Sequence, residues 1–170
     1  TLFRSVDYTL RAIDCDYESY EIMDFTYSKD KMNAFYNGEK IPGSSSVSFQ
    51  VLKVPYSKDH KNVYFRNKVI DNADPETFTL FEENENSTGE TYYAKDKNHI
   101  FVNDRVFVGV DKATFKILDG RYCLDKYGVY FQMKKLKNAD SRTFKVYPHY
   151  MGDADAEDKN HKYGDGKIVD

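Results

Sequence analysis

The sequence predicts an all-β protein made of tandem β-hairpin repeats, and three observations support this prediction. A phrase that begins with Asp-Lys or Asp-His recurs five times in the 170 residues. Each copy precedes an aromatic pair or its remnant, as Asp30 precedes Phe35-Tyr36. The chain contains 15 Tyr and 12 Phe but no Trp, and this aromatic content favours strands, where such side chains pack on a pleated surface.

The repeat length follows from the five aspartates that open the phrase, called here the motif aspartates. They stand at positions 30, 59, 96, 125 and 158, with spacings of 29, 37, 29 and 33 residues. A second anchor, a Ser or Thr followed by an aromatic residue, precedes each of them: Ser19-Tyr20, Ser48-Phe49, Thr77-Phe78, Thr114-Phe115 and Thr143-Phe144. All variation in length lies between the two anchors, as expected when loops are inserted into a fixed unit of about 29 residues.

These anchors predict a single domain over residues 1–170 with five units, at approximately 15–43, 44–72, 73–109, 110–138 and 139–170. Residues 1–14 are predicted to add a capping strand or strand pair. One hairpin cannot bury itself, so neighbouring units are expected to stack into one array. A small, propeller-like closed arrangement is the alternative.

Each unit is predicted to be a three-stranded meander with two turns. The third position after the motif aspartate holds residue types that tolerate left-handed backbone, as a three-residue hairpin loop requires: Asn33, Asn62, His99, Gly128 and His161. Seven and eight residues after the aspartate comes a second turn of two residues. Asn37-Gly38 and Asp165-Gly166 are strong sequences for it, whereas Gln132-Met133 is a poor one.

Apolar columns indicate which faces of the strands are buried. The aromatic columns three residues before and five residues after the motif aspartate, such as Tyr56 and Tyr64, are predicted to share a sheet face. Val63 and its equivalents occupy the opposite face, so both faces are expected to be covered. A short helical turn capped by Asp, as in Asp74-Pro75-Glu76-Thr77, is expected to join the units.

Charge and composition exclude several classes of protein. The net charge of −3 gives no nucleic-acid footprint, and no apolar run approaches the roughly 18 residues that span a bilayer. Cys15 and Cys123 are expected to be buried thiols rather than a bridge. The chain begins at Thr1 without a Met, which leaves open signal-peptide cleavage, trimming and disorder.

No residue pattern indicates catalysis or metal binding. The motif aspartates fall one per turn, which favours a structural role, and His60, His99 and His161 belong to copies of the same turn. The run Asp153-Ala154-Asp155-Ala156-Glu157 resembles the start of a calcium loop but lacks the later glycine and glutamate. No Ser-His-Asp order, glycine-rich phosphate loop or Cys-His cluster stands out. We therefore predict no catalytic residue, no metal site, no cofactor and no enzymatic activity.

Two insertions between the anchors are strongly acidic. Residues 82–91 contain four glutamates, residues 147–158 contain four acidic residues, and neither segment contains Lys or Arg. Because both insertions leave the same point of the repeat, they are predicted to form an acidic rim that steers a basic protein partner. The alternative is that they are solvated loops. The candidate protein-binding residues are Glu82, Glu83, Glu85, Glu90, Asp153, Asp155 and Glu157.

The repeats resemble the DKNYY family of bacterial proteins. The resemblance rests on Asp96-Lys97-Asn98-His99-Ile100-Phe101 and on the second anchor in Ala73-Asp74-Pro75-Glu76-Thr77-Phe78 and Ala139-Asp140-Ser141-Arg142-Thr143-Phe144. It covers roughly residues 15–170 and departs at Asp125-Lys126-Tyr127-Gly128 and in the Asn33 copy. The resemblance implies a bacterial source, with members that are exported or that accompany toxin genes, and it carries over no catalytic residue.

Two functional hypotheses follow. The first is a non-catalytic protein-binding module, most concretely an immunity protein that blocks a basic toxin domain such as a nuclease by occluding its active site. This protein would be cytoplasmic. The second is an exported module of the cell envelope or surface that binds glycan or another envelope component through exposed tyrosines. A signal peptide before Thr1 would favour the second hypothesis.

Overall fold

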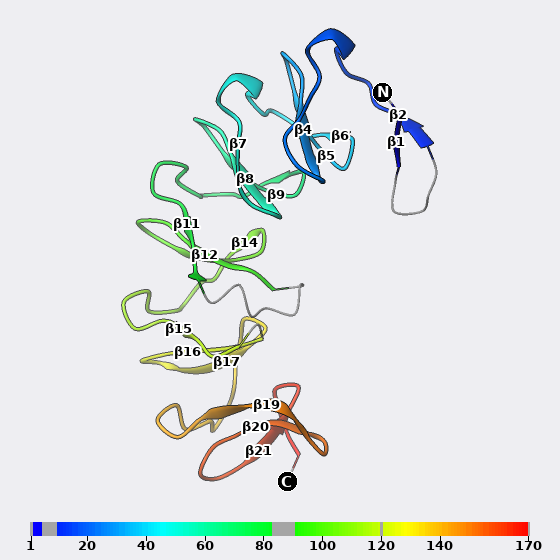
Figure 1. Ribbon diagram of the computed structural model, residues 1–170. Coiled ribbons are helices and arrows are strands. Elements are labelled where there is room, and N and C mark those ends of the chain that lie inside the picture. The colour runs from blue at the N-terminus through cyan, green and yellow to red at the C-terminus, as the bar shows by residue number, and fades with distance from the viewer. Residues whose placement is uncertain (1, 5–9, 83–90, 120, 170) are drawn as a thin grey trace. The chain divides into compact units, whose positions relative to one another are not determined.

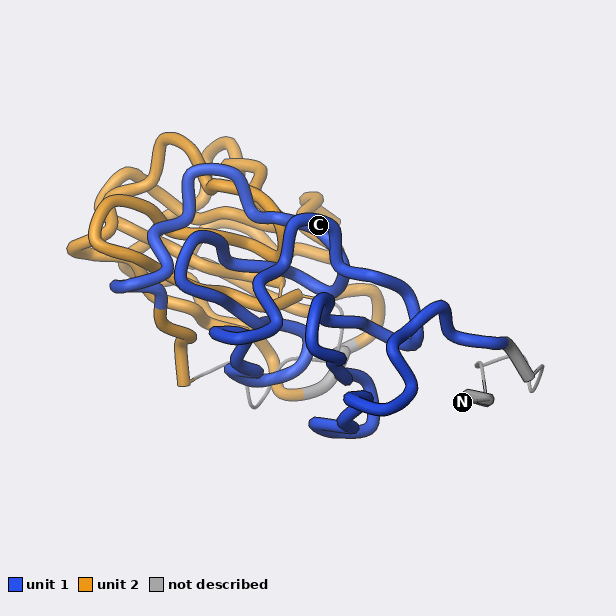
Figure 2. The backbone as a smooth tube through the Cα atoms, turned by 90° about the horizontal axis from the view of Figure 1, so that it is seen from above, with its two compact units in different colours: residues 1–78 blue, residues 79–170 orange. Residues whose placement is uncertain are grey.

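The computed structural model describes residues 2–4, 10–82, 91–119 and 121–169. The chain divides into two compact units, residues 1–78 and residues 79–170 (Figure 2). This division passes through the third predicted repeat, and the single domain over residues 1–170 stays a prediction.

The described residues form five antiparallel sheets of four strands, and each sheet lies within one predicted repeat (Figure 1). In the first compact unit the sheets contain β3 (Glu21–Ile22), β4 (Tyr27–Lys29), β5 (Ala34–Tyr36) and β6 (Glu39–Lys40), then β7 (Gln50–Lys53), β8 (Tyr56–Lys58), β9 (Val63–Phe65) and β10 (Lys68–Val69). In the second they contain β11 (Thr79–Leu80), β12 (Tyr93–Lys95), β13 (Ile100–Val102) and β14 (Arg105–Val106), then β15 (Lys116–Ile117), β16 (Tyr122–Asp125), β17 (Gly128–Phe131) and β18 (Lys134–Lys135), then β19 (Lys145–Met151), β20 (Ala154–Glu157), β21 (Lys162–Gly164) and β22 (Lys167–Ile168).

This arrangement confirms the predicted all-β class with meander repeats. Strands that follow one another in sequence are neighbours in every sheet, and no sheet of the described residues closes into a barrel or propeller. Of the two alternatives predicted for residues 1–14, the strand pair forms: β1 (Leu2–Arg4) and β2 (Leu10–Ala12) pair with each other as a separate two-stranded sheet.

Each sheet has one strand more than the sequence predicted. The additional strand comes directly after the second anchor, as β3 follows Tyr20 and β7 follows Phe49. Glu21 and Ile22 of β3 are both exposed. Such a strand is held by main-chain hydrogen bonds at the sheet edge and has no buried face, so its side chains carry no hydrophobic alternation to reveal it.

Short helical turns precede these edge strands, as predicted. The 3-10 helix η1 (Tyr17–Ser19) begins at Asp16, whose carboxylate accepts the Ser19 N–H at 3.1 Å. The serine-rich connection forms a similar helix, η2 (Ser46–Ser48), but its cap residue Ser45 makes no side-chain hydrogen bond to the helix.

The first turn of the repeat differs from the prediction. Lys58 pairs with Val63, so the loop between β8 and β9 holds four residues rather than three. Its last residue, Asn62, does not have a positive φ, and the same is true of three other residues for which left-handed backbone was predicted: Asn33, His99 and His161. Gly128 has a positive φ of 151°, but it pairs with Asp125 as the first residue of β17 and does not close a three-residue loop. The aspartate carboxylate, described below, holds the turn without left-handed backbone.

This one-residue difference in loop length changes which side chains share a face. Tyr56 pairs directly with Phe65, so these two lie on one face and Tyr64 lies on the other. The prediction that the Tyr56 and Tyr64 columns share a face was therefore wrong. The prediction that apolar side chains cover both faces is confirmed, since Tyr56, Val63 and Tyr64 are all buried.

The second turn is a two-residue turn in all five repeats, as predicted, and its first residue has a positive φ each time. Gln132 and Met133 adopt φ of 45° and 66° although neither residue type favours left-handed backbone. Met133 packs against the core between two neighbouring sheets, and this contact favours a Met where Gly would suit the turn.

Within each compact unit, the core lies between consecutive repeats. In the second unit, Tyr93 and Ile100 of one repeat pack against Phe115, Cys123 and Tyr130 of the next. The Tyr122 column packs in the same way on Phe144 and Tyr163 of the last repeat, and the Tyr27 column packs on Phe49 and Tyr64 in the first compact unit. Within each compact unit, one repeat thus covers apolar side chains of its neighbour.

Both cysteines are free. Cys123 is buried as predicted, and burial raises the pKa of its thiol to about 12. Cys15 is only half-buried. No described helix is long and apolar enough to cross a membrane.

Candidate functional site

The first turn of each repeat is built around a buried carboxylate. Asp59 Oδ1 accepts the N–H groups of Lys61 at 2.7 Å and Asn62 at 2.8 Å. Its Oδ2 accepts the Ser45 N–H at 2.8 Å and the Tyr64 hydroxyl at 2.7 Å. The Oδ1 atoms of the other motif aspartates accept the same two turn N–H groups: Asp30, Asp96, Asp125 and Asp158.

These contacts favour the ionised form of three of the carboxylates. Burial alone would raise the pKa of Asp59, but the hydrogen bonds from Ser45, Tyr64 and the turn N–H groups outweigh it and hold the pKa below its ordinary value. The pKa values of Asp30 and Asp158 are lowered against burial in the same way. A carboxylate whose oxygens already accept hydrogen bonds from donors of its own repeat has a structural role.

A second contact ties the turn to the helical turn of the same repeat. The hydroxyl of the second anchor accepts the N–H of the residue after the motif aspartate, as Thr114 accepts from Lys126 at 3.0 Å. In the same repeat the Lys126 ammonium lies 2.7 Å from the carboxylate of the cap residue Asp111. The first and last repeats have equivalent ion pairs, Lys31–Asp16 and Lys159–Asp140.

The second repeat departs from this plan in both partners. Ser45 stands where the others have a cap Asp, and His60 stands where they have Lys. The His60 N–H still donates to the anchor hydroxyl of Ser48 at 3.2 Å, but the His60 ring also turns to Ser48, with Nδ1 at 2.7 Å from Oγ. The His60 ring thus contacts the anchor residue, whereas the lysine side chain at the same position in the first, fourth and last repeats contacts the cap aspartate.

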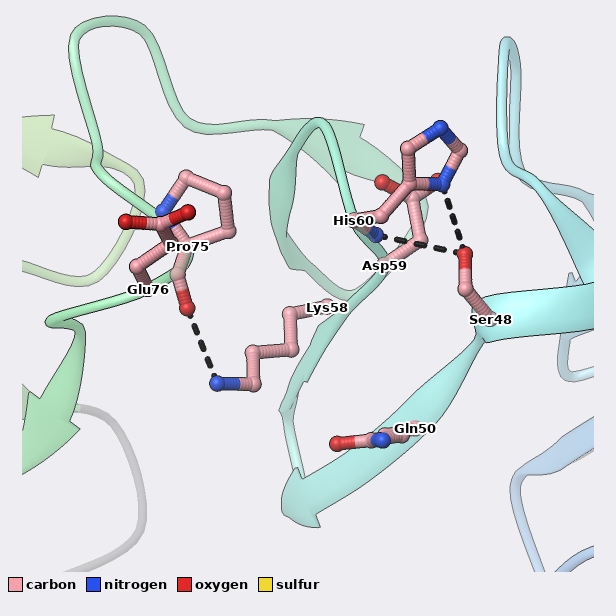
Figure 3. Close-up of a pocket in the computed structure, with 7 residues that line it drawn as sticks. All are labelled: Ser48, Gln50, Lys58, Asp59, His60, Pro75 and Glu76. Atoms are coloured by element: carbon pink, nitrogen blue, oxygen red, sulfur yellow. Dashed lines mark hydrogen bonds between the residues drawn. The ribbon is translucent and has the colours of Figure 1, made fainter.

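A groove of about 290 Å³ lies between this turn and the helical turn that opens the third repeat (Figure 3). We call it the Pro75 groove. Lys58 reaches across it to donate to the Pro75 carbonyl oxygen at 2.8 Å. Gln50 and Glu76 are exposed at its walls. Its lining residues are Ser48, Gln50, Lys58, Asp59, His60, Pro75 and Glu76.

The Pro75 groove offers hydrogen-bond donors and acceptors, and its lining includes a positively charged residue, Lys58, and a negatively charged one, Glu76. Ser48 and His60 are residue types of a nucleophile and its base, but a working pair needs a third group to orient the imidazole. The neighbouring carboxylate of Asp59 is bonded to four donors and faces the turn. The arrangement therefore suits recognition of a polar side chain better than nucleophilic chemistry.

Metal ligation finds no support in the part of the chain that the structure describes, where no three His, Cys, Asp or Glu side chains gather. The run that resembles the start of a calcium loop lies partly in strand β20, where Ala154 and Ala156 are buried. His99 and His161 lie in first turns beside Phe101 and Tyr163.

The acidic candidates are distributed unevenly. Glu82 is exposed just after β11, and Asp153 is exposed in the turn between β19 and β20. The first segment lies between β11 and β12, whereas the second contains parts of β19 and β20 and the turn between them. Glu83, Glu85 and Glu90 lie outside the described residues.

Asp155 and Glu157 do not belong to an exposed rim. Residues 147–158 form a hairpin of β19 and β20 rather than a loop. Buried Asp155 accepts the Tyr122 hydroxyl at 2.7 Å and pairs with Arg121 at 2.8 Å. Half-buried Glu157 accepts the Tyr147 hydroxyl at 2.6 Å. Asp155 is therefore not an exposed contact residue, and the sequence contains a signal of this, since the four earlier repeats have Tyr in its column.

The residues that line the Pro75 groove were not recognised from the sequence. The sequence identifies Ser48 as an anchor residue, and it predicts that His60 is a turn residue rather than a metal ligand or a general acid or base. The useful signal was the joint departure of Ser45 and His60 from the Asp and Lys of the other repeats. A second groove, of about 330 Å³, lies at the second turns of the third and fourth repeats and is lined by Thr91, Val102, Asn103, Asp104, Arg105, Gln132 and Met133.

Comparison with known proteins places the chain in one family. No curated protein and no solved structure was found to match it. The model of the DKNYY family matches residues 36–167, which is more than half of the chain. The chain therefore belongs to the DKNYY family.

Proposed function

We propose that this protein is a non-catalytic protein-binding module, and specifically an immunity protein that neutralises a basic bacterial toxin, such as a nuclease, by occluding its active site. The observation that carries the proposal is the acidic sequence inserted between the first and second strands of two sheets in the second compact unit. Glu82 and Asp153 of these insertions are exposed, and neither insertion contains Lys or Arg. Asp155 of the second insertion pairs with Arg121, but exposed negative charge such as that of Glu82 and Asp153 steers a basic partner and orients it.

The repeat frame supports such a role. Insertions of different length leave the same point of a fixed meander, so this edge tolerates sequence change that the sheets do not. With Asp155 and Glu157 engaged in the fold, the proposed contact residues are Glu82, Glu83, Glu85, Glu90 and Asp153.

The test is rescue of growth. The protein encoded beside this chain's gene is expressed in a bacterial host with and without the chain, and growth arrest relieved by the chain is the expected result. Affinity of the purified pair is then measured at about 0.01 M and about 0.15 M salt, across which the Debye length falls from roughly 30 Å to roughly 8 Å. We expect clearly tighter binding at the lower salt. Toxicity that persists in the presence of the chain, with no complex formed, would exclude the immunity function.

Charge reversal tests the contact surface. Glu82→Lys, Glu83→Lys and Glu85→Lys combined are expected to weaken binding at least tenfold, at roughly 0.5 kcal/mol for each rim charge. The matched control reverses three exposed acidic residues outside the insertions, Glu18, Glu21 and Asp71. Equal affinity for the triple variant and the wild-type chain would exclude the acidic mechanism.

A second candidate function rests on exposed aromatic rings. Tyr17 and Tyr127 are 75% and 55% exposed, and an exposed Tyr ring provides an apolar face with a polar tip that suits sugars. The candidate is an exported envelope or surface module that binds glycan or another envelope component. Co-sedimentation with purified cell-wall glycan, lost in Tyr17→Ala and Tyr127→Ala, is the outcome that would favour it, whereas soluble protein after centrifugation would exclude it.

A further inference from the structure

The helical turn of one repeat reaches back to the first turn of the repeat before it. In the second repeat, the residue after the cap is Ser46, and its hydroxyl donates to the Asp30 carbonyl oxygen. In the fourth repeat the equivalent residue is Lys112, whose ammonium donates to the carbonyl oxygens of Asp96, at 2.9 Å, and Lys97. A side-chain donor from the next repeat thus occupies this place twice.

The third repeat has no side-chain donor at this one position. Pro75 stands at the position of Ser46 and Lys112, and a proline side chain has no N–H or O–H. The equivalent carbonyl groups belong to Asp59 and His60, and both residues line the Pro75 groove. The groove therefore exists where the protein's own side chain is missing.

We propose that the Pro75 groove binds a lysine side chain of a basic protein partner, with its ammonium on the Asp59 and His60 carbonyl oxygens as Lys112 is on those of Asp96 and Lys97. This inference rests on the proposed function for the basic character of the partner, and it adds a second contact surface, in the first compact unit. The groove, at about 290 Å³, is just below the range of roughly 300–1,000 Å³ for drug-sized ligands. Its size suits one long side chain.

The charges around the groove are compatible with a cation. Glu76 supplies a carboxylate where the fourth repeat has Ala113. The positive charge of Lys58 repels a second ammonium group, but the Lys58 ammonium is already bonded to the Pro75 carbonyl oxygen. Lys95 stands at the equivalent position of the third repeat, and Lys112 nevertheless binds there, while Lys95 lies 4.8 Å from the Phe81 ring centre. A lysine at this position therefore does not prevent an ammonium from binding.

The probe for the experiment is a blocked peptide, acetyl-Gly-Lys-Gly-amide, titrated into the whole chain and followed by backbone amide chemical shifts. We expect saturable shifts at Ser48, His60 and Glu76, with a dissociation constant on the order of millimolar. The same peptide with an acetylated lysine amine keeps the length and loses the charge, and it is expected to bind at least tenfold more weakly. Equal shifts with both peptides would overturn the proposal.

Two matched variants test the Pro75 groove and the equivalent position that Lys112 occupies in the following repeat. One variant fills the open position, and the other opens the filled one. Pro75→Lys should fill its own groove as Lys112 does, and the peptide-induced shifts at Ser48 and His60 should disappear. Lys112→Ala should open the equivalent place and create new shifts at Lys97 and Thr114. Because Lys is already tolerated at this position in the fourth repeat, Pro75→Lys is expected to fold. Undiminished peptide binding by Pro75→Lys would also overturn the proposal.

The experiments separate this inference from the proposed function. If a basic partner binds the wild-type and Pro75→Lys chains equally, and the peptide causes no shifts, only the lysine site is excluded. If the peptide binds the groove but the chain neither relieves the growth arrest nor forms a complex with the product of the neighbouring gene, the immunity function is excluded and the lysine site remains. Glu76→Gln should weaken the peptide two- to fivefold, and a larger loss at low salt is expected for a charge effect.

Discussion

The Pro75 groove and the equivalent place in the following repeat share one backbone plan and differ in what occupies it. At Asp96 and Lys97 the ammonium of Lys112 lies against the two carbonyl oxygens. At Asp59 and His60 the corresponding residue is Pro75, and a groove remains. Both turns are nevertheless held by the same carboxylate contacts. The comparison shows that the carboxylate holds the backbone of the turn in the same way in both repeats. The residue after the cap differs between them, and it decides whether a binding position is open.

The largest expected effect on stability comes from removing the turn carboxylate in the second repeat or in the third. Asp59→Ala should lower the free energy of unfolding by about 3 kcal/mol, because it leaves buried donors unpaired, including the Tyr64 hydroxyl. Asp96→Ala should cost about 2 kcal/mol, since Phe101 stands where Tyr64 donates. Urea denaturation measures both, with exposed Asp71→Ala as a control near zero. A loss below about 0.5 kcal/mol for Asp59→Ala would contradict the role of the turn carboxylate.

An intermediate effect is expected from acid. The pKa of Asp59 in the folded chain lies below its ordinary value because its hydrogen bonds outweigh burial. Its stabilising contribution is therefore fully present above the unfolded pKa of about 3.9 and is lost as the pH falls through the lower folded pKa. Stability measured from about pH 5 to about pH 2 should fall less steeply for Asp59→Asn than for the wild-type chain. Equal slopes would show that the Asp59 pKa is not lowered.

The smallest effect is expected from restoring the common plan in the second repeat. Ser45→Asp with His60→Lys recreates the cap and ion pair of the other repeats, seen in Asp111 and Lys126. The regained cap should raise the free energy of unfolding by roughly 1 kcal/mol, while the exposed ion pair adds little. Because His60→Lys also adds a positive charge beside the Pro75 groove, the lysine peptide should bind more weakly. Thermal unfolding and the peptide titration measure the two effects, and unchanged stability would contradict the capping argument.

The recurrence of two anchors predicted much of the fold. Strand pairs, two-residue second turns and helical caps repeat in register, because each depends on local residue types such as the Asn-Gly of residues 37–38. The edge strand β3 escaped prediction, since its exposed side chains show no pattern. The first turn was misread because its carboxylate replaces left-handed backbone by accepting N–H groups, and residue type alone does not show where a side chain bonds.

The candidate site was predicted less well than the fold. The repeat register revealed the two insertions that contain Glu82 and Asp153, because an insertion is a departure visible in the sequence. It did not indicate that Asp155 bonds Arg121 and Tyr122, since that contact joins residues from two repeats. It also gave no reason to single out Ser48 and Pro75, which meet only across stacked repeats.

The sequence by itself determined the repeat, its length, its all-β class and the family, because these depend on residues close together along the chain and on their recurrence. Only the tertiary structure decided the register of the first turn, the face on which each aromatic side chain lies and the place where the array leaves a groove. The physical reason is that a one-residue change of register reverses the faces of a strand. Whether a groove is filled depends in turn on side chains contributed by the next repeat. Lys112 fills the position at Asp96 and Lys97, whereas Pro75 leaves the equivalent position at Asp59 and His60 open.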